Sequence, residues 1–269
     1  MFPALLFCPG DRPDRFEKAL AAADGVVLDL EDAVSPDSKT TARGVVVDAL
    51  RRLPLDRVVV RINGVDSPWH DADVETLREV RGVTVMLPKA ELPPQVAALA
   101  PAPVIALCET ALGILASAQL AQVSNCSGLL WGSEDLAVSL HGRSSRYRSG
   151  ALTGVSAHAR HTVLVAARSA GRFAIDAAHV DIKDTAGLAA ETLDAVTMGF
   201  DAKACIHPAQ VQHVRDAFVP DAEELRWARA VLAAAAQAPG VFRYEGRMID
   251  APLVEHARTL LRAASAESP

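Results

Sequence analysis

The alternation of short apolar runs with longer stretches of helical spacing constrains the fold of this chain most. Most of the runs are near-continuous Val, Ile and Leu, which is typical of parallel strands buried on both faces. The runs cover residues 4–8, 25–30, 57–62, 82–87, 103–108, 128–132, 172–176 and 203–206. Helical spacing is found at about 13–23, 38–52, 71–80, 92–100, 112–121, 151–170 and 186–199. Eight parallel strands close without leaving an exposed edge, so the pattern predicts a (β/α)8 TIM barrel rather than an open sheet.

The C-terminal part of the chain exceeds what eight strand–helix units require. No linker or change of composition divides residues 1–215, which we predict to form the barrel domain. Two further helices are expected at about 208–216 and 221–238, followed by a turn at Pro239-Gly240 and a last helix. We predict that residues 216–269 form a helical extension. It either decorates the barrel or reaches a neighbouring subunit as a lid.

Composition excludes several classes of protein. Half of the 269 residues are hydrophobic, which excludes wholesale disorder. Lys and Arg number 27 against 33 Asp and Glu, a net charge of −6 without a basic run, which argues against a nucleic-acid partner. No apolar stretch reaches the ~20 residues of a membrane span, and the N-terminus lacks the basic region of a signal peptide. Four scattered cysteines form no CxxC pair. We expect a soluble, cytoplasmic protein.

Polar residues follow nearly every apolar run at its C-terminal end. In a parallel barrel these ends share one rim, where the active sites of such barrels are built. The sequence therefore predicts that these side chains converge on one pocket. The rim residues are Asp29, Glu31, Asp32, Arg61, Asn63, Lys89, Glu109, Glu134, Asp135, Asp176 and His207.

Two of these carboxylates, Glu109 and Asp135, follow neighbouring strands and are candidates to hold one cation. Carboxylate oxygens without Cys or clustered His ligands suit Mg²⁺, with water and substrate completing its coordination. The alternative is that Asp135 caps the helical stretch that follows it.

Arg61 and Lys89 each have two interpretations. The planar guanidinium of Arg61 suits a substrate carboxylate, but an ion pair with Asp29 or Glu31 explains it equally. Lys89 follows a strand, yet the nearby Glu91 favours an ion-paired lysine over a Schiff-base lysine. His207 is a candidate pocket residue with an orienting or structural role as the alternative.

The same segments resemble the citrate lyase β-subunit-like (CitE-like) family of the HpcH/HpaI aldolase and malyl-CoA lyase group. The matching segments run in order along the whole chain, which makes the resemblance specific. They include Leu6-Phe7-Cys8-Pro9-Gly10-Asp11-Arg12-Pro13, Asp29-Leu30-Glu31-Asp32, Val60-Arg61-Ile62-Asn63-Gly64, Pro88-Lys89-Ala90-Glu91, Glu109-Thr110-Ala111, Gly132-Ser133-Glu134-Asp135, Cys205-Ile206-His207-Pro208 and Gly246-Arg247-Met248-Ile249-Asp250-Ala251-Pro252.

The resemblance implies roles for individual residues. Glu109 and Asp135 would hold Mg²⁺, or Mn²⁺ in its place. Arg61 would bind the carboxylate of the keto acid in a pocket also lined by Glu109, Asp29 and Glu31. Asp250, from the lid of an adjacent subunit, would act in proton transfer. The residues that help to hold coenzyme A would be Phe7, Arg12 and Lys18.

The implied activity is a Mg²⁺-dependent carbon–carbon lyase. It would cleave, or form by Claisen condensation, a β-hydroxyacyl-CoA such as citramalyl-, malyl- or citryl-CoA, giving acetyl-CoA and a 2-keto acid. We expect a homotrimer, with a hexamer as the alternative assembly. Two other functions stay open: the β-subunit of a multi-protein citrate lyase acting on an acyl-carrier-protein thioester, and a non-catalytic barrel that binds CoA thioesters. Because CoA is anionic, a basic entry built from Arg12, Lys18 and Lys39 is also expected.

Overall fold

The computed structural model describes residues 3–237 and 240–265. Contacts divide the chain into two compact units, Met1–Val214 and Arg215–Pro269, which are described separately. The predicted role of the second unit as a lid stays a prediction.

The first unit is built on a closed parallel barrel of eight strands in sequence order. The strands are β1 (Ala4–Pro9), β2 (Gly25–Asp29), β3 (Val58–Arg61), β4 (Thr84–Leu87), β5 (Val104–Cys108), β6 (Cys126–Trp131), β7 (Phe173–Asp176) and β8 (Ala202–Cys205). Strand β1 pairs with β2 on one side and with β8 on the other, which closes the barrel. The predicted (β/α)8 barrel is confirmed.

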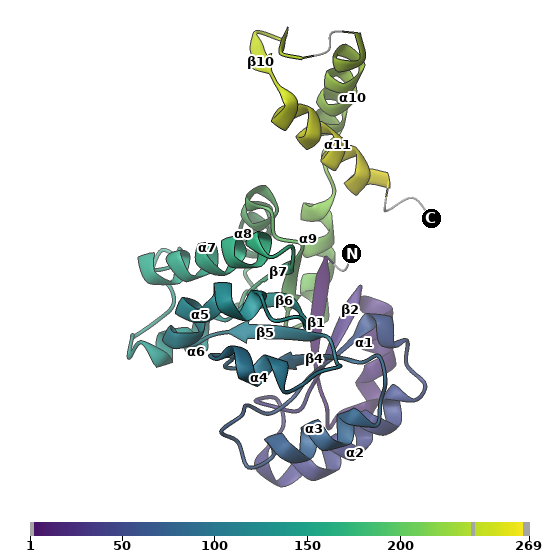
Figure 1. The fold of residues 1–269 in the computed structure, drawn as a ribbon, viewed down its shortest axis with the longest axis vertical. Coiled ribbons are helices and arrows are strands. Elements are labelled where there is room, and N and C mark those ends of the chain that lie inside the picture. The colour runs from purple at the N-terminus through teal and green to yellow at the C-terminus, as the bar shows by residue number, and fades with distance from the viewer. Residues whose placement is uncertain (1–2, 238–239, 266–269) are drawn as a thin grey trace. The chain divides into compact units, whose positions relative to one another are not determined.

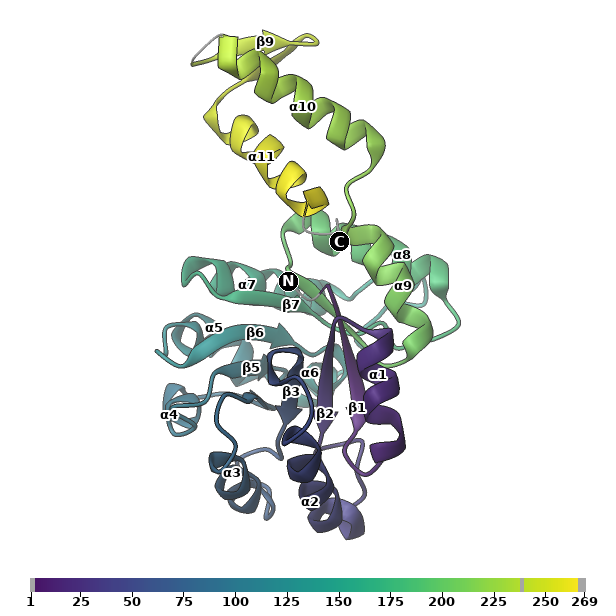
Figure 2. The same cartoon turned by 90° about the vertical axis from the view of Figure 1, so that its right-hand side faces the viewer.

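Helices surround the barrel on its outside (Figure 1). They are α1 (Phe16–Ala22), α2 (Lys39–Leu50), α3 (His70–Arg78), α4 (Pro93–Ala97), α5 (Ala111–Ala121), α6 (Ser133–Ser139), α7 (Gly154–Ser169), α8 (Thr185–Met198) and α9 (Pro208–Phe218). Figure 2 shows two of these helices beside the strands that they connect: α1 connects β1 to β2, and α2 connects β2 to β3. The short helix α6 starts directly at the end of β6, so Asp135 lies in its first turn.

Apolar side chains fill the barrel interior. Ten buried residues form one cluster there: Leu5, Val27, Val59, Met86, Ile105, Leu107, Leu130, Ile175, Ala202 and Ala204. Side chains alternate between the two faces of a strand, so the intervening residues face the surrounding helices. This alternation decides which residues near the strand ends face into the barrel.

The second unit consists of two helices and a hairpin. Helix α10 (Ala222–Gln237) packs against α11 (Ala251–Ser265), and β9 (Phe242–Tyr244) pairs antiparallel with β10 (Arg247–Ile249). Ala228, Val231, Ile249 and Ala257 form the buried core of this unit. Of the predicted turn at Pro239-Gly240, Pro239 lies outside the described residues. Among the helices that the structure describes, none combines the length and the apolar character that crossing a membrane requires.

Candidate active site

Strand alternation brings four of the candidate side chains to the carboxyl end of the barrel interior. On β2 and β3, Val27 and Val59 point inward, so Asp29 and Arg61, two residues later, face the same way. Glu109 follows Leu107 in the same manner, and Phe7 follows Leu5. The residue spacing along each strand therefore assembles charged groups directly above the apolar layer.

Arg61 forms ion pairs with Asp29 and Glu31, the two acids named from the sequence as its alternative partners. Its Nε and Nη2 donate hydrogen bonds to the Asp29 carboxylate at 2.7 and 2.6 Å. Its Nη1 lies 2.8 Å from Glu31 Oε2. Burial by itself lowers the pKa of Arg61, but the bonds to Asp29 and the charge of Glu31 raise it above its ordinary value. The ion-pair interpretation thus describes this structure, while a guanidinium with five N–H donors still keeps donors for a substrate carboxylate.

Lys89 is a second cation beside the carboxylate cluster, which consists of Asp29, Glu31, Asp32, Glu109 and Asp135. Its Nζ lies 2.6 Å from Glu31 Oε1, 3.4 Å from Asp135 Oδ1 and 3.8 Å from Glu109 Oε1. Burial alone lowers the pKa of Lys89, but the hydrogen bond to Glu31 and the surrounding carboxylates raise it well above its ordinary value. A Schiff-base lysine needs a lowered pKa, so that role is disfavoured here. The predicted partner was wrong, because Glu91 instead accepts a hydrogen bond from Thr110 Oγ1.

Glu109 and Asp135 meet at the ends of β5 and β6. Glu109 is 3% exposed, and its burial, followed by the nearby Asp135 charge, raises the pKa of its carboxyl to about 8. Asp135 is more open, with 38% of its side chain exposed. The N-cap of α6 is Gly132 and it shows no side-chain cap, so the capping role considered for Asp135 is not seen.

Gly132 allows these two strand ends to approach each other. A Cβ at this position would lie 2.7 Å from Glu109 Oε2 and 2.8 Å from Glu109 Cβ. Its backbone, with φ −118° and ψ 128°, is an ordinary extended conformation, so the close approach and not the torsion requires glycine. Sequence reasoning quoted Gly132 within a motif but did not identify this contact.

The chemistry of these side chains fits a magnesium ion. Mg²⁺ is usually bound through one or two carboxylates, with water and substrate supplying the other oxygens. Among the described residues there is no group of three or more His, Cys, Asp and Glu suited to hold a metal. The Lys89 ammonium nevertheless lies within ion-pair distance of both carboxylates, so the two face one position that a cation already occupies. Glu31 Oε2 is also buried and accepts no hydrogen bond of good geometry within the described chain.

Four of the rim residues do not join this cluster, so the prediction that all strand ends converge was too broad. Asn63 donates to Asp73, and Glu134 accepts from Ser145. His207 is exposed and its Nδ1 accepts a hydrogen bond from the backbone N–H of Ala209. Asp176 follows the inward-facing Ile175 and therefore points to the outside of the barrel wall, where it is fully buried.

Around Asp176 lies a buried ionic network that sequence reasoning missed. Its carboxylate accepts hydrogen bonds from Arg160, Lys203 and Trp131 Nε1. Lys203 Nζ, with a side chain that is 0% exposed, also donates to Glu191 at 2.8 Å. The charged Lys203 between the apolar Ala202 and Ala204 in a strand-like run was the signal that could have located it.

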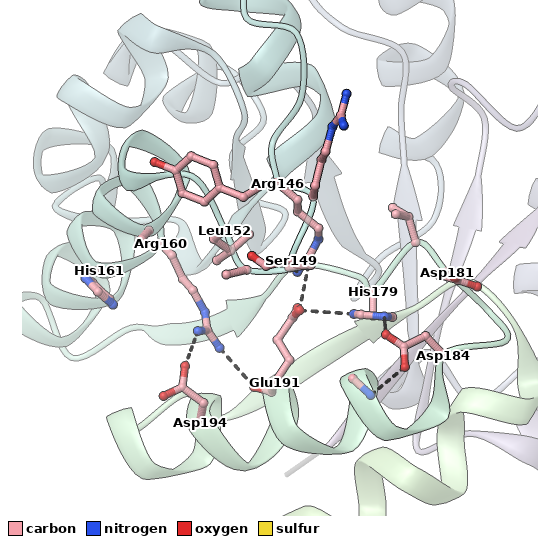
Figure 3. Close-up of a pocket in the computed structure, with 17 residues that line it drawn as sticks. Arg146, Ser149, Leu152, Arg160, His161, His179, Asp181, Asp184, Glu191 and Asp194 are labelled. Carbon is pink, nitrogen blue, oxygen red and sulfur yellow. Dashed lines mark hydrogen bonds and ion pairs between the residues drawn. The ribbon is translucent and has the colours of Figure 1, made fainter.

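A cavity of about 630 Å³ opens beside this network, bordered by residues 146–152, α7, residues 179–181, Asp184 and α8. Figure 3 shows Glu191 between Arg146 and His179 at its wall, with Arg160 bound to Asp194. None of the predicted site residues lines this cavity.

The residues expected to hold coenzyme A lie in different surroundings. Phe7 packs against the barrel core, with its ring centroid 5.0 Å from Arg61 Cζ. Arg12 is exposed and bonded to Asp14, and Lys18 is exposed on α1. Lys39 does not contribute to a basic entry, because it is 6% exposed and its Nζ donates to the carbonyls of Leu30 and Glu31.

Asp250 belongs to the second unit. It directly precedes α11, and its Oδ1 accepts a long hydrogen bond of 3.4 Å from the N–H of Leu253. Its part in proton transfer stays a prediction.

The raised pKa of Glu109 leads to a prediction about the metal-free protein. Between pH 4.5, the ordinary pKa of a glutamate, and about pH 8, the folded state binds this proton more tightly than the unfolded state, so stability falls as pH rises. Glu109→Gln is not ionised, and at about pH 9 we expect it to be more stable than wild type by ~2–4 kcal/mol. The gain should shrink to a small value near pH ~5. Urea unfolding with a chelator present measures this, and a gain independent of pH would contradict it.

The fold and the site define the class: a (β/α)8-barrel protein with a carboxylate-rich site at the carboxyl ends of its strands. The chain belongs to the HpcH/HpaI aldolase/citrate lyase family, whose model matches residues 4–208, and the resemblance drawn from the sequence is confirmed.

Individual proteins support this membership. The citrate lyase subunit beta-like protein of Mycobacterium tuberculosis is 50% identical over 264 residues, covering 97% of this chain and 95% of that protein. The (3S)-malyl-CoA thioesterase of Cereibacter sphaeroides is 34% identical over 276 residues, covering 98% and 95%. The structure is similar to that of CitE from Mycobacterium tuberculosis in complex with magnesium, acetoacetate and coenzyme A. The TM-score is 0.94, with 49% identity, and 98% of each chain is covered.

Proposed function

We propose that this protein is a Mg²⁺-dependent carbon–carbon lyase acting on a β-hydroxyacyl-CoA, with citramalyl-, malyl- and citryl-CoA as candidate substrates. The products are acetyl-CoA and a 2-keto acid, and the reverse reaction is a Claisen condensation. The observation that carries the proposal is the meeting of Glu109 and Asp135 around one cation position, within the same cluster as Arg61. The similar CitE structure, whose complex contains magnesium, acetoacetate and coenzyme A, supports it.

In the proposed reaction, a base takes up the hydroxyl proton, the hydroxyl-bearing carbon becomes the carbonyl of the keto acid, and the carbon–carbon bond breaks. The bonding electrons pass to the thioester enolate, and a proton added to its terminal carbon completes acetyl-CoA. A Mg²⁺ held by Glu109 and Asp135 would supply Lewis-acid polarisation of the keto acid oxygens. Arg61 binds the carboxylate end of the keto acid with the donors left on its Nη nitrogens.

Asp29 and Glu31 serve this reaction by orienting Arg61. Their contacts hold the guanidinium on three sides, so little side-chain freedom remains to be lost when substrate binds. Asp250 is proposed to exchange a proton with the acetyl carbon. We propose that it acts from the adjacent subunit of a homotrimer, or of a hexamer.

A second candidate activity is hydrolysis of the thioester. The relative named (3S)-malyl-CoA thioesterase, at 34% identity over 98% of this chain, favours it. A thioesterase releases free coenzyme A and a hydroxy acid, whereas a lyase releases acetyl-CoA and a keto acid.

A substrate panel tests the proposal. The purified protein is incubated with citramalyl-, malyl-, citryl- and hydroxymethylglutaryl-CoA, and the products are identified by mass spectrometry. We expect acetyl-CoA and a keto acid from at least one thioester, loss of turnover with a chelator, and recovery on adding Mg²⁺. Free coenzyme A with a hydroxy acid would replace the lyase by the thioesterase. Turnover that survives complete chelation, or binding without any turnover, would overturn the proposed metal-dependent reaction.

A further inference from the structure

Lys89 has a backbone conformation that L-residues rarely adopt. Its φ is +51°, in the left-handed region, and such a residue persists only where its surroundings hold it. Its backbone N–H donates to Glu109 Oε1 at 3.1 Å, while its ammonium reaches Glu31. The unusual backbone therefore turns both donors of one residue toward the carboxylate cluster.

The Lys89 ammonium faces the same oxygens that would bind the metal. It lies 3.4 Å from Asp135 Oδ1 and 3.8 Å from Glu109 Oε1, which are ion-pair distances and not tight hydrogen bonds. Mg²⁺ binds carboxylate oxygens at ~2.0–2.1 Å, so a metal on both residues would lie within a few ångströms of the ammonium. Two cations this close repel each other strongly in a partly buried site.

Two other carboxylates can pair with the Lys89 ammonium once it leaves Glu109 and Asp135. Its closest partner is Glu31, at 2.6 Å, and Glu31 is not one of the two proposed metal ligands. Asp32 Oδ2 lies 4.0 Å away on a side chain that is 63% exposed, and the Lys89 side chain is 40% exposed. A small outward movement therefore keeps the ammonium paired while it leaves Glu109 and Asp135.

We propose that Lys89 is an internal counter-ion that occupies the cation position in the metal-free protein and moves toward Glu31 and Asp32 when a divalent metal binds. This rests on the proposed metal site. Lys89 then lowers the affinity for the metal, and while the metal is absent it stabilises the acidic groups that it faces, those of Glu31, Asp32, Glu109 and Asp135. After displacement, the ammonium stays beside the pocket as a positive charge for an anionic substrate.

Metal binding without substrate tests this proposal directly. Lys89→Met keeps the length of the side chain and removes its charge, and Mn²⁺ binding is measured by calorimetry and electron paramagnetic resonance. We expect about tenfold tighter binding than in wild type, since one competing charge at ~4 Å is removed from a partly screened site. Lys183→Met, at an exposed lysine outside the cluster, is the matched control and should bind as wild type does. Equal or weaker binding by Lys89→Met would overturn the proposal.

A second measurement uses the wild-type protein and does not depend on the folding of a variant. Lysine side chains are acylated with and without Mg²⁺, and the labelled peptides are quantified by mass spectrometry. We expect Mg²⁺ to increase labelling of Lys89 severalfold while Lys183 is unchanged. Unchanged labelling of Lys89 in metal-saturated protein would exclude the displacement. If wild type bound no divalent metal at all, the proposed function would fail, whereas metal binding insensitive to Lys89 would remove only this inference.

Discussion

Replacing Lys203 with methionine is expected to destabilise the folded protein by ~3–5 kcal/mol, a large part of the stability of an ordinary domain. The Lys203 ammonium is fully buried and donates to Asp176, Glu191 and the carbonyl of Ala177, each at 2.8 Å. Removing one partner of a buried pair leaves the other charge without compensation, and methionine cannot restore those bonds. Urea unfolding of the metal-free variant measures the loss.

The test of Lys203 has two controls. Arg51→Met removes an exposed ion pair with Asp48 on α2, and we expect a change below ~0.5 kcal/mol. The double variant Lys203→Met/Glu191→Gln removes one charge of each sign, so it should be less destabilised than the sum of its single variants. A Lys203→Met protein as stable as Arg51→Met would show that the buried network does not hold α8 to the barrel wall.

Replacing Gly132 with alanine is expected to reduce turnover by about a hundredfold or more, with the fold retained. The new Cβ would lie 2.7 Å from Glu109 Oε2, so either the Glu109 carboxylate or the end of β6 has to move. Either movement changes the distance between Glu109 and Asp135, and hence the geometry offered to a metal. The added methyl group should also lower stability by ~1–3 kcal/mol. Steady-state turnover and Mn²⁺ binding measure the functional loss.

Gly64→Ala provides the matched control for Gly132. Gly64 follows β3 at the same end of the barrel, and a Cβ there would meet only Pro88 Cγ, at 4.0 Å. We expect turnover and metal affinity close to wild type in this variant. Full activity in Gly132→Ala would mean that the contact between this glycine and Glu109 does not position the site.

The order of the strands could be predicted from the sequence because burial on both faces leaves a local signature. All eight apolar runs overlap the observed strands, and in most of them Val, Ile and Leu stand at successive positions, as a parallel strand covered on both sides favours. A helical stretch was expected after Asp135, but α6 begins two residues earlier, at Ser133, because seven residues at a strand end show too little periodicity to place a helix start.

The sequence predicted which residues belong to the candidate site, but not which charged side chains pair with each other. Asp29, Glu31, Arg61, Glu109 and Asp135 were all identified from their positions at strand ends. The partner of Lys89 was wrong because the nearest acid in sequence, Glu91, is bonded to Thr110, whereas Glu31 is 58 residues away. Lys39 was expected to be exposed, yet it is buried against the carbonyl oxygens of the β2–α2 connection.

The sequence by itself determined the barrel, the strand ends that carry charge and the family to which the chain belongs, because these follow from local hydrophobic pattern and ordered motifs. Only the tertiary structure decided which side of the barrel wall each charge faces and which charge it meets. Asp29 and Asp176 both end buried strands, but one faces the barrel interior with Arg61 and the other faces the helices with Lys203. Side-chain direction alternates with every residue, so a one-residue difference in register separates a carboxylate of the candidate site from a structural one.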